Sequence, residues 1–174
     1  YSGVGGRIHR GTPHEVAQQV GVFTRQGIER ILRYGFELAA TRPRKMLASA
    51  TKSNALTYSM VLWDEVAEIV RKDYPSVDYR KYHVDALAAR MITHPQTLDV
   101  LVTSNLFGDI LTDIGSAISG SLGIAPGANI NPSRTFPSMF EPIHGSAPDI
   151  AGKGIANPIG AIWAGALMLD HLGR

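Results

Sequence analysis

The sequence predicts an α/β protein, because short apolar strands alternate along it with amphipathic helices. The run at residues 98–103 is short, rich in branched side chains and closed by Ser104-Asn105, which is typical of a buried strand. Residues 28–39 instead carry apolar side chains at helical spacing. The regular change from one pattern to the other favours α/β architecture over an all-helical or an all-strand fold.

The first half of the chain gives the clearest elements. Residues 14–23 alternate well enough to predict a strand, and Thr24 then suits the N-cap of a helix. That helix is predicted to stop at Arg42-Pro43, because a residue before proline disfavours the helical conformation. The elements predicted next are a strand at 45–50, a helix at 58–72, a strand at 77–84, a helix at 85–92 and the strand at 98–103.

The second half is less regular. We expect Gly108 to let the chain turn and residues 109–114 to form the first turns of a helix. Residues 120–157 are rich in Gly, Pro, Asn and Ser with little periodicity, and such a long loop in a compact domain is usually functional. Residues 158–169 are apolar nearly all round, which predicts a buried helix needing partners on more sides than this chain supplies.

Composition excludes several classes of protein. The net charge is only +2 and the basic residues are scattered, with one cluster at 42–45 that resembles a helix-ending loop, so nucleic-acid binding is not expected. Without cysteine there is no disulfide and no thiolate metal site. No apolar run reaches the roughly 18 residues of a membrane span, and we expect a cytoplasmic protein. Because the chain begins without Met, at Tyr1, and ends as a helix closes, we also expect a fragment.

Two aspartates four residues apart, Asp109 and Asp113, follow the strand at 98–103. At this spacing both carboxylates project from one face of a helix, near the strand ends where open α/β sheets usually hold ligands. Two hard oxygen donors suit Mg²⁺ or Mn²⁺. The other interpretation is a helix cap beside a solvated carboxylate, and taken alone the pair fits that interpretation better.

Two further charged residues follow predicted strands. Lys52 is bounded by small residues, where partial desolvation would suit a general base, although a surface lysine in a turn is the commoner case. Asp85 stands at the end of the next strand, where it serves equally well as a helix N-cap. These residues therefore stay open between catalytic and structural roles.

The loop at residues 141–157 has features that suit an adenosine. His144 offers a flat ring beside the exposed backbone of Gly145, Ser146 and Ala147 permit close approach, and Asp149 offers a carboxylate to ribose hydroxyls. No G-x-G-x-x-G or Walker-type phosphate loop is present, so the usual dinucleotide fold is not supported. A Gly/Pro loop with one histidine is otherwise most often only a loop.

Three collinear motifs resemble one known family. NLFGDILTD at 105–113, EPIHGSAPD at 141–149 and GKGIANP at 152–158 resemble the metal-dependent β-decarboxylating hydroxyacid dehydrogenases, which include the isopropylmalate, isocitrate, homoisocitrate and tartrate/D-malate enzymes. YSGVGGR at 1–7 and NPSRTFPSMF at 131–140 are most similar to the tartrate/D-malate branch. The resemblance implies an isocitrate/isopropylmalate dehydrogenase-like α/β fold, incomplete in this chain.

The resemblance also implies a reaction and a set of site residues. A 2-hydroxy dicarboxylic acid such as tartrate or D-malate is oxidised by NAD with metal-assisted β-decarboxylation. Asp109 and Asp113 hold Mg²⁺ or Mn²⁺ together with Asp85 of the partner subunit. The general base is Lys52, also from the partner, and the proton donor is Tyr1. The cofactor-binding residues are Asn54, His144, Gly145, Ser146, Ala147, Asp149 and Asn157.

The same resemblance implies a division of the chain. Residues 1–119 would form a smaller, dimer-forming domain with the metal and substrate site. Residues 120–174 would form part of a larger domain with the NAD-binding loop and the buried helix. Family members carry arginines that bind the substrate carboxylates in a segment before the position of Tyr1, so this chain corresponds to a central piece. We expect a homodimer with shared active sites.

Three alternatives remain at this stage. One is a 3-isopropylmalate dehydrogenase of the same family. Another is a truncated, non-catalytic dimerisation module, which the lack of the arginine segment would fit. The last is a metal-dependent hydrolase in which the motifs occur by chance.

Overall fold

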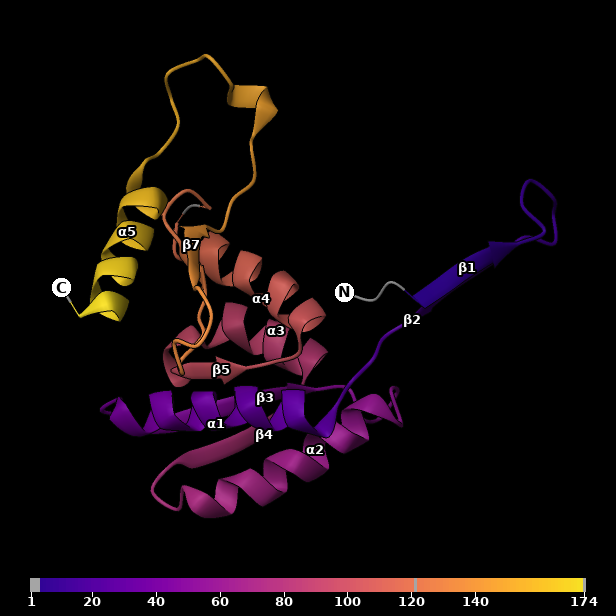
Figure 1. Cartoon of the computed structure of the whole chain (residues 1–174), viewed down its shortest axis with the longest axis horizontal. Coiled ribbons are helices and arrows are strands. Elements are labelled where there is room, and N and C mark those ends of the chain that lie inside the picture. The colour runs from indigo at the N-terminus through magenta and orange to yellow at the C-terminus, as the bar shows by residue number, and fades with distance from the viewer. Residues whose placement is uncertain (1–3, 121, 174) are drawn as a thin grey trace. The chain divides into compact units, whose positions relative to one another are not determined.

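The computed structural model describes residues 4–120 and 122–173, and Tyr1 lies outside this part. The chain forms two compact units, residues 1–111 and residues 112–174. Figure 1 shows the order of elements from β1 to α5. No helix among the described residues is long and apolar enough to cross a lipid bilayer.

A parallel sheet with the strand order β4-β3-β5 forms the centre of the first unit. β3 (Met46–Thr51) lies between β4 (Asp78–His83) and β5 (Val100–Val102). All residues of β3 are buried, as expected for a central strand whose two faces are both covered. The sequence therefore predicted these three strands correctly, with bounds that differ by a few residues.

Helices α2 (Ser59–Val70) and α3 (Val84–Thr93) connect these strands. α2 leads from β3 to β4, and α3 leads back from β4 across β3 to β5. The two connections therefore cross the sheet in opposite directions. Because such crossovers are right-handed in nearly all proteins, the two helices lie on opposite faces of the sheet (Figure 1). Short 3-10 helices follow each, η1 (Arg71–Asp73) and η2 (Pro95–Thr97).

Helix α1 (Arg25–Thr41) begins and ends where the sequence predicts. Thr24 is its N-cap, because the side-chain oxygen of Thr24 accepts a hydrogen bond from the Gly27 backbone N–H at 3.1 Å. At the other end, Arg42 already has an extended conformation, as expected for a residue before proline.

The hydrophobic core of this unit lies between the sheet and helices α1 and α2. Gly35 allows α1 to approach the sheet, since a Cβ at this position would lie 3.3 Å from the Cβ of Val102. The largest fully buried apolar side chains of the unit are Phe36, Leu32, Leu47, Met60, Leu87, Val66 and Val70.

An antiparallel hairpin precedes α1. It pairs β1 (Val4–Ile8) with β2 (Val16–Val20), so the strand predicted at 14–23 is confirmed over its centre. Every residue of both strands is exposed. The register places the four apolar residues on one face of the hairpin, because alternate residues of a strand share a face, and these are Val4, Ile8, Val16 and Val20.

Helix α4 (Asn105–Ile118) differs from the prediction at its start. Gly108 was expected to form a turn ahead of the helix, but its N–H donates to the Ser104 carbonyl at 2.8 Å, as in a regular helical turn. The helix therefore begins at Asn105, and Asp109 lies in its second turn. Asn105 and the short side chain of Ser104 were stronger start signals than Gly108.

The second unit contains a hairpin that the sequence did not predict. β6 (Pro126–Asn129) pairs antiparallel with β7 (Met139–Pro142), within the stretch expected to be one irregular loop. These four-residue strands contain Pro and Gly, which are depleted in strands, and are too short to show a period. The other described residues of the stretch form no strand or α-helix, and they include the 3-10 helix η3 (Pro148–Ile150).

Helix α5 (Ile159–Leu172) packs against this hairpin (Figure 1). The prediction of a helix at 158–169 is confirmed, and the helix extends slightly further. Its burial is one-sided, because Gly160 and Ala164 are buried whereas Ile162 is 68% exposed and Trp163 49% exposed. The described part of the chain therefore covers α5 on one side only, whereas its apolar sequence predicts contacts on several sides.

Candidate active site

The carboxyl ends of the three parallel strands bring the predicted charged residues to one edge of the sheet. Lys52 directly follows β3, Asp85 lies in the first turn of α3 after β4, and α4 begins shortly after β5. This edge is where open α/β sheets hold their ligands.

Lys52 and Asp85 form an ion pair across this edge. The distance from Lys52 Nζ to Asp85 Oδ1 is 2.8 Å, and the side chains are 26% and 67% exposed. The Lys52 carbonyl also accepts hydrogen bonds from the N–H groups of Ala55 at 2.9 Å and Leu56 at 2.8 Å. Lys52 is thus held by its backbone and by its ammonium group, and its side chain is partly buried.

The hydrogen bond from Lys52 lowers the pKa of the Asp85 carboxyl, and the backbone N–H groups of Asp85 and Ala86 lower it further. The N-cap of α3 is His83, so the alternative in which Asp85 is the cap residue was wrong. Asp85 lies instead within the first helical turn, where the helix dipole favours a carboxylate.

Asp109 and Asp113 lie on α4, one helical turn apart, with exposed side chains. This geometry fits a divalent cation, because both carboxylates project from one helix face and supply the oxygen ligands such ions prefer. Among the residues that the structure describes, no three or more His, Asp or Glu side chains lie close enough together to hold a metal ion. The predicted set of three takes Asp85 from a second copy, which a single chain does not contain.

The predicted cofactor residues of the second unit lie together on the segment between β7 and α5. His144 Nδ1 is 3.0 Å from the Gly145 carbonyl oxygen. Because a carbonyl only accepts, Nδ1 carries the hydrogen, which leaves Nε2 of a neutral ring as an acceptor. Ser146 and Asp149 are exposed, so the edge of the imidazole, a hydroxyl and a carboxylate are all accessible on this segment.

Two residues of the same segment also shape its backbone. Ala147 has a left-handed conformation, with φ of 43° and ψ of 61°, and its carbonyl accepts from the Ile150 N–H at 3.1 Å to form η3. Asn157 Oδ1 accepts a hydrogen bond from the Ile159 N–H at 3.0 Å, at the start of α5. The side-chain oxygen of Asn157 is therefore bonded to the helix, whereas its amide N–H groups have no hydrogen-bond partner among the described residues.

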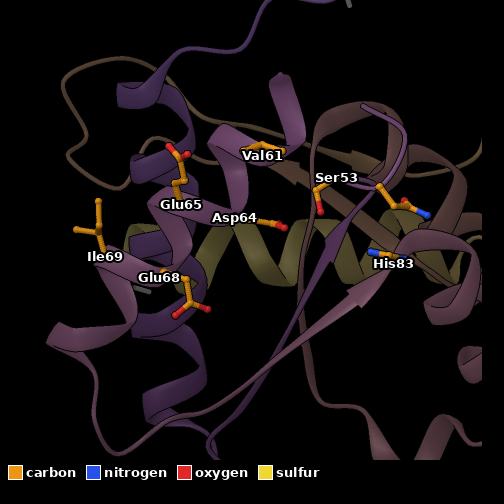
Figure 2. A pocket seen from close by; sticks show the side chains of 8 residues that line it. Ser53, Val61, Asp64, Glu65, Glu68, Ile69 and His83 are labelled. Carbon is orange, nitrogen blue, oxygen red and sulfur yellow. The ribbon is translucent and has the colours of Figure 1, made fainter. Parts of the chain in front are cut away.

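A cavity of about 710 Å³ lies beside the Lys52 turn, and the sequence did not predict it. Helix α2 supplies one wall, and Figure 2 shows the Asp64 side chain directed toward Ser53 and His83. Asp64 Oδ2 accepts from Lys81 Nζ at 3.1 Å. The α2 residues of the lining recur at helical spacing, and this spacing is the sequence pattern that points to a shared wall. The lining comprises Ser53, Asn54, Val61, Asp64, Glu65, Glu68, Ile69 and His83.

Known proteins match this arrangement over the whole chain. Residues 1–174 match the isocitrate/isopropylmalate dehydrogenase family. The chain is 62% identical to the decarboxylating D-malate dehydrogenase of Escherichia coli strain K12 over 174 residues, which is 100% of this chain and 48% of that protein. It is 60% identical to a probable tartrate dehydrogenase/decarboxylase of Bacillus subtilis strain 168, with coverage of 100% and 49%.

The fold is shared with a solved structure of the same kind. The isocitrate dehydrogenase of Methylococcus capsulatus superposes with a TM-score of 0.90 at 43% identity, covering 98% of this chain and 50% of that one. The chain thus spans about half the length of the curated relatives it matches. Its fold is the α/β fold of these dehydrogenases over that half. By sequence and by structure, the chain belongs to the isocitrate/isopropylmalate dehydrogenase family.

Proposed function

We propose that this chain is the part of an NAD-dependent, Mg²⁺- or Mn²⁺-dependent dehydrogenase that handles the metal and the cofactor. The substrate is a 2-hydroxy dicarboxylic acid of the D-malate or tartrate type, and oxidation is followed by loss of CO₂. The observation that carries the proposal is the 2.8 Å ion pair between Lys52 and Asp85 at the carboxyl edge of the sheet. The names of the D-malate and tartrate relatives support the same reaction class.

Lys52 has the role of general base in this proposal. In the ion pair with Asp85 the amine carries a proton, so Lys52 acts as a base only after that proton has left to solvent. The neutral Nζ then takes the proton of the substrate hydroxyl, and the Asp85 carboxylate stabilises the ammonium group that results. Asp85 Oδ1 is the oxygen that lies 2.8 Å from Lys52 Nζ, and in this proposal the same carboxylate also binds the cation. The positions of both residues in one chain fit a site in which they act together from the partner subunit.

Asp109 and Asp113 would hold the divalent cation from the other subunit, and His144, Asp149 and Asn157 would hold the adenosine part of NAD. When bound, the cation supplies charge stabilisation on the substrate oxygens and the nicotinamide ring supplies the hydride acceptor. Tyr1 protonates the carbon from which CO₂ has left. The remaining proposed cofactor residues are Asn54, Gly145, Ser146 and Ala147.

We further propose that residues 1–119 belong to a smaller, dimer-forming domain and residues 120–174 to a larger one. Each active site then needs two subunits. The isolated chain is expected to turn over hydroxy acids far more slowly than the full-length protein, because arginines outside this chain would hold the substrate carboxylates.

The test uses a full-length protein that contains this chain. NADH formation is followed with Mn²⁺ and, in turn, D-malate, L-tartrate and 3-isopropylmalate. Lys52→Ala is expected to abolish turnover, and Lys72→Ala is the control because Lys72 lies on the exposed η1 helix. Equal activity of the two variants would contradict the assignment of Lys52. If NADH formed with 3-isopropylmalate but not with D-malate or L-tartrate, the proposed substrate would be wrong and 3-isopropylmalate would take its place.

The metal assignment has a separate test. Asp109→Asn keeps the size of the side chain but removes its charge, so Mn²⁺ affinity measured by calorimetry is expected to fall at least about tenfold. Asp78→Asn is the matched control, because Asp78 begins β4 at the opposite end of the sheet. Unchanged Mn²⁺ affinity in Asp109→Asn would exclude Asp109 as a ligand.

A further inference from the structure

The segment that carries the proposed cofactor residues is held mainly at its two ends. We call residues 143–158 the cofactor loop. Hydrogen bonds within it are local, such as Ile150 N–H to the Ala147 carbonyl and Lys153 N–H to the Ile150 carbonyl, each at 3.1 Å. In Figure 1 this loop leaves β7, extends away from the hairpin and returns to α5. Its shape therefore depends on how β7 and α5 are fixed against each other.

One fixation lies at the base of the loop. The Ile143 N–H donates to the Ala125 carbonyl at 3.2 Å, and the Gly160 N–H donates to the Gly123 carbonyl at 2.9 Å. A Cβ on Gly160 would lie 3.0 Å from the Gly123 oxygen, so a larger residue would push α5 away from the hairpin.

A second fixation lies at the far end of α5, and we call it the staple. Arg134 donates from its guanidinium to the backbone carbonyl of His171 in the last turn of α5. The His171 ring is at the same time 3.3 Å from Ser138 Oγ, measured from Nε2, and its centroid is 5.6 Å from that of Phe140. One helix end is thereby bound to both the connection before β7 and the strand itself.

Hydrogen bonds in the turn around Arg134 fix the backbone conformation of this residue. The residue has a left-handed conformation, with φ of 56°. The turn is closed by Asn131, whose carbonyl accepts from the Arg134 N–H at 3.0 Å and whose amide donates to Thr135 Oγ1 at 3.2 Å. The Asn131 N–H donates in turn to Ser138 Oγ at 2.9 Å, so Ser138 links this turn to His171. A non-glycine residue in this strained conformation is maintained only where the surroundings fix it.

We propose that Arg134 is a positioning residue for the cofactor loop, acting through the staple on β7 and α5. This inference rests on the proposed function, since it assumes that the loop binds NAD. The guanidinium also satisfies a helix carbonyl that has no partner within the helix, and its positive charge is favourable at a helix carboxyl end. Loss of the staple lets the hairpin and α5 shift, and the loop between them loses its arrangement for binding.

The experiment measures NADH affinity and steady-state kinetics in the full-length protein. Arg134→Met keeps the aliphatic length but removes the donors, and it is expected to weaken NADH binding at least about fivefold and raise the NAD KM, with kcat at saturating NAD nearly unchanged. Arg134→Lys keeps a charge and a donor, so most of the affinity is expected to return.

A control separates positioning from a simple loss of helix stability. Gly173 ends α5 in a left-handed conformation, with φ of 75°, so Gly173→Ala weakens the same helix end without touching the staple. The proposal predicts little change in NADH affinity for Gly173→Ala. Equal weakening in Gly173→Ala and Arg134→Met, or unchanged affinity in Arg134→Met, overturns it. If the unmodified protein does not bind NADH, the proposed function fails instead.

Discussion

Two buried hydroxyls on the central strand offer a sharp test of the structure. Ser49 and Thr51 lie on the same face of β3, and both are 0% exposed. Ser49 Oγ accepts a hydrogen bond from Trp63 Nε1 at 2.9 Å. Thr51 Oγ1 has no hydrogen-bond partner in the part of the chain that the structure describes. The two positions therefore differ mainly in whether the hydroxyl is paired.

The expected free energies follow from that difference. Ser49→Ala leaves the buried Trp63 N–H without an acceptor, which costs about 1–3 kcal/mol of unfolding free energy. Thr51→Val replaces an unpaired buried hydroxyl with a methyl group of similar shape, so the change is expected to be neutral or to stabilise by up to about 1 kcal/mol. The changes in unfolding free energy of the two variants should thus differ by at least about 1 kcal/mol, with Ser49→Ala the less stable of the two.

Urea unfolding of the full-length protein, followed by far-ultraviolet circular dichroism, measures both values without relying on tryptophan fluorescence. In a Trp63→Phe background the cost of Ser49→Ala is expected to fall by about 1 kcal/mol, because both partners are then absent. Equal destabilisation by Ser49→Ala and Thr51→Val, or an unchanged cost in the Trp63→Phe background, would refute the pairing and with it the packing of α2 on β3.

Three further outcomes are expected in the full-length protein. Asp149→Lys with Ile150→Tyr should reduce a preference for NAD over NADP that is more than about tenfold in the unmodified protein, because the Asp149 carboxylate repels a 2′-phosphate; kcat/KM with each cofactor measures this. Lys52→Ala and Asp109→Ala should each be inactive, yet mixed dimers should regain activity if the two residues serve one site from different subunits; inactive dimers after proven subunit exchange would exclude sharing. Burial raises the pKa of Tyr79 from 10.0 to about 12, so the folded state keeps its proton longer than the unfolded state. Stability should therefore fall by roughly 2 kcal/mol between pH 10 and 12, and Tyr79→Phe should lack this loss in pH-dependent unfolding.

The sequence predicted the first unit well because its signals are local. Thr24 and Pro43 mark the ends of α1 through capping and through the restriction before proline, and the structure has both ends at these positions. The strands of the parallel sheet are short apolar runs between helices, and they were found for the same reason. Lys52 and Asp85 were each placed after one of these strands, and in the structure they form an ion pair at one edge of the sheet.

The second unit was less predictable because its structure depends on contacts distant in sequence. β6 contains Pro126 and Gly127, which argue against a strand, and it forms only because β7 pairs with it. The staple of Arg134 and His171 joins residues 37 positions apart, and no local pattern announces it. The start of α4 was misplaced for the opposite reason, since Gly108 was given more weight than the cap signals before it. The assignments of Tyr1 and of the metal and cofactor residues remain predictions.

The hydrogen bond between Asn157 and the Ile159 amide makes ligand contact with the cofactor loop measurable by hydrogen exchange. Asn157 Oδ1 protects the Ile159 amide hydrogen, which otherwise belongs to the unpaired first turn of α5. A ligand that takes this oxygen would expose the Ile159 amide to solvent and speed its hydrogen–deuterium exchange. A ligand that uses only the amide N–H groups of Asn157 would hold the side chain in place and slow that exchange. The exchange rate of one backbone amide would thus distinguish the two modes of ligand contact without any measurement of catalysis.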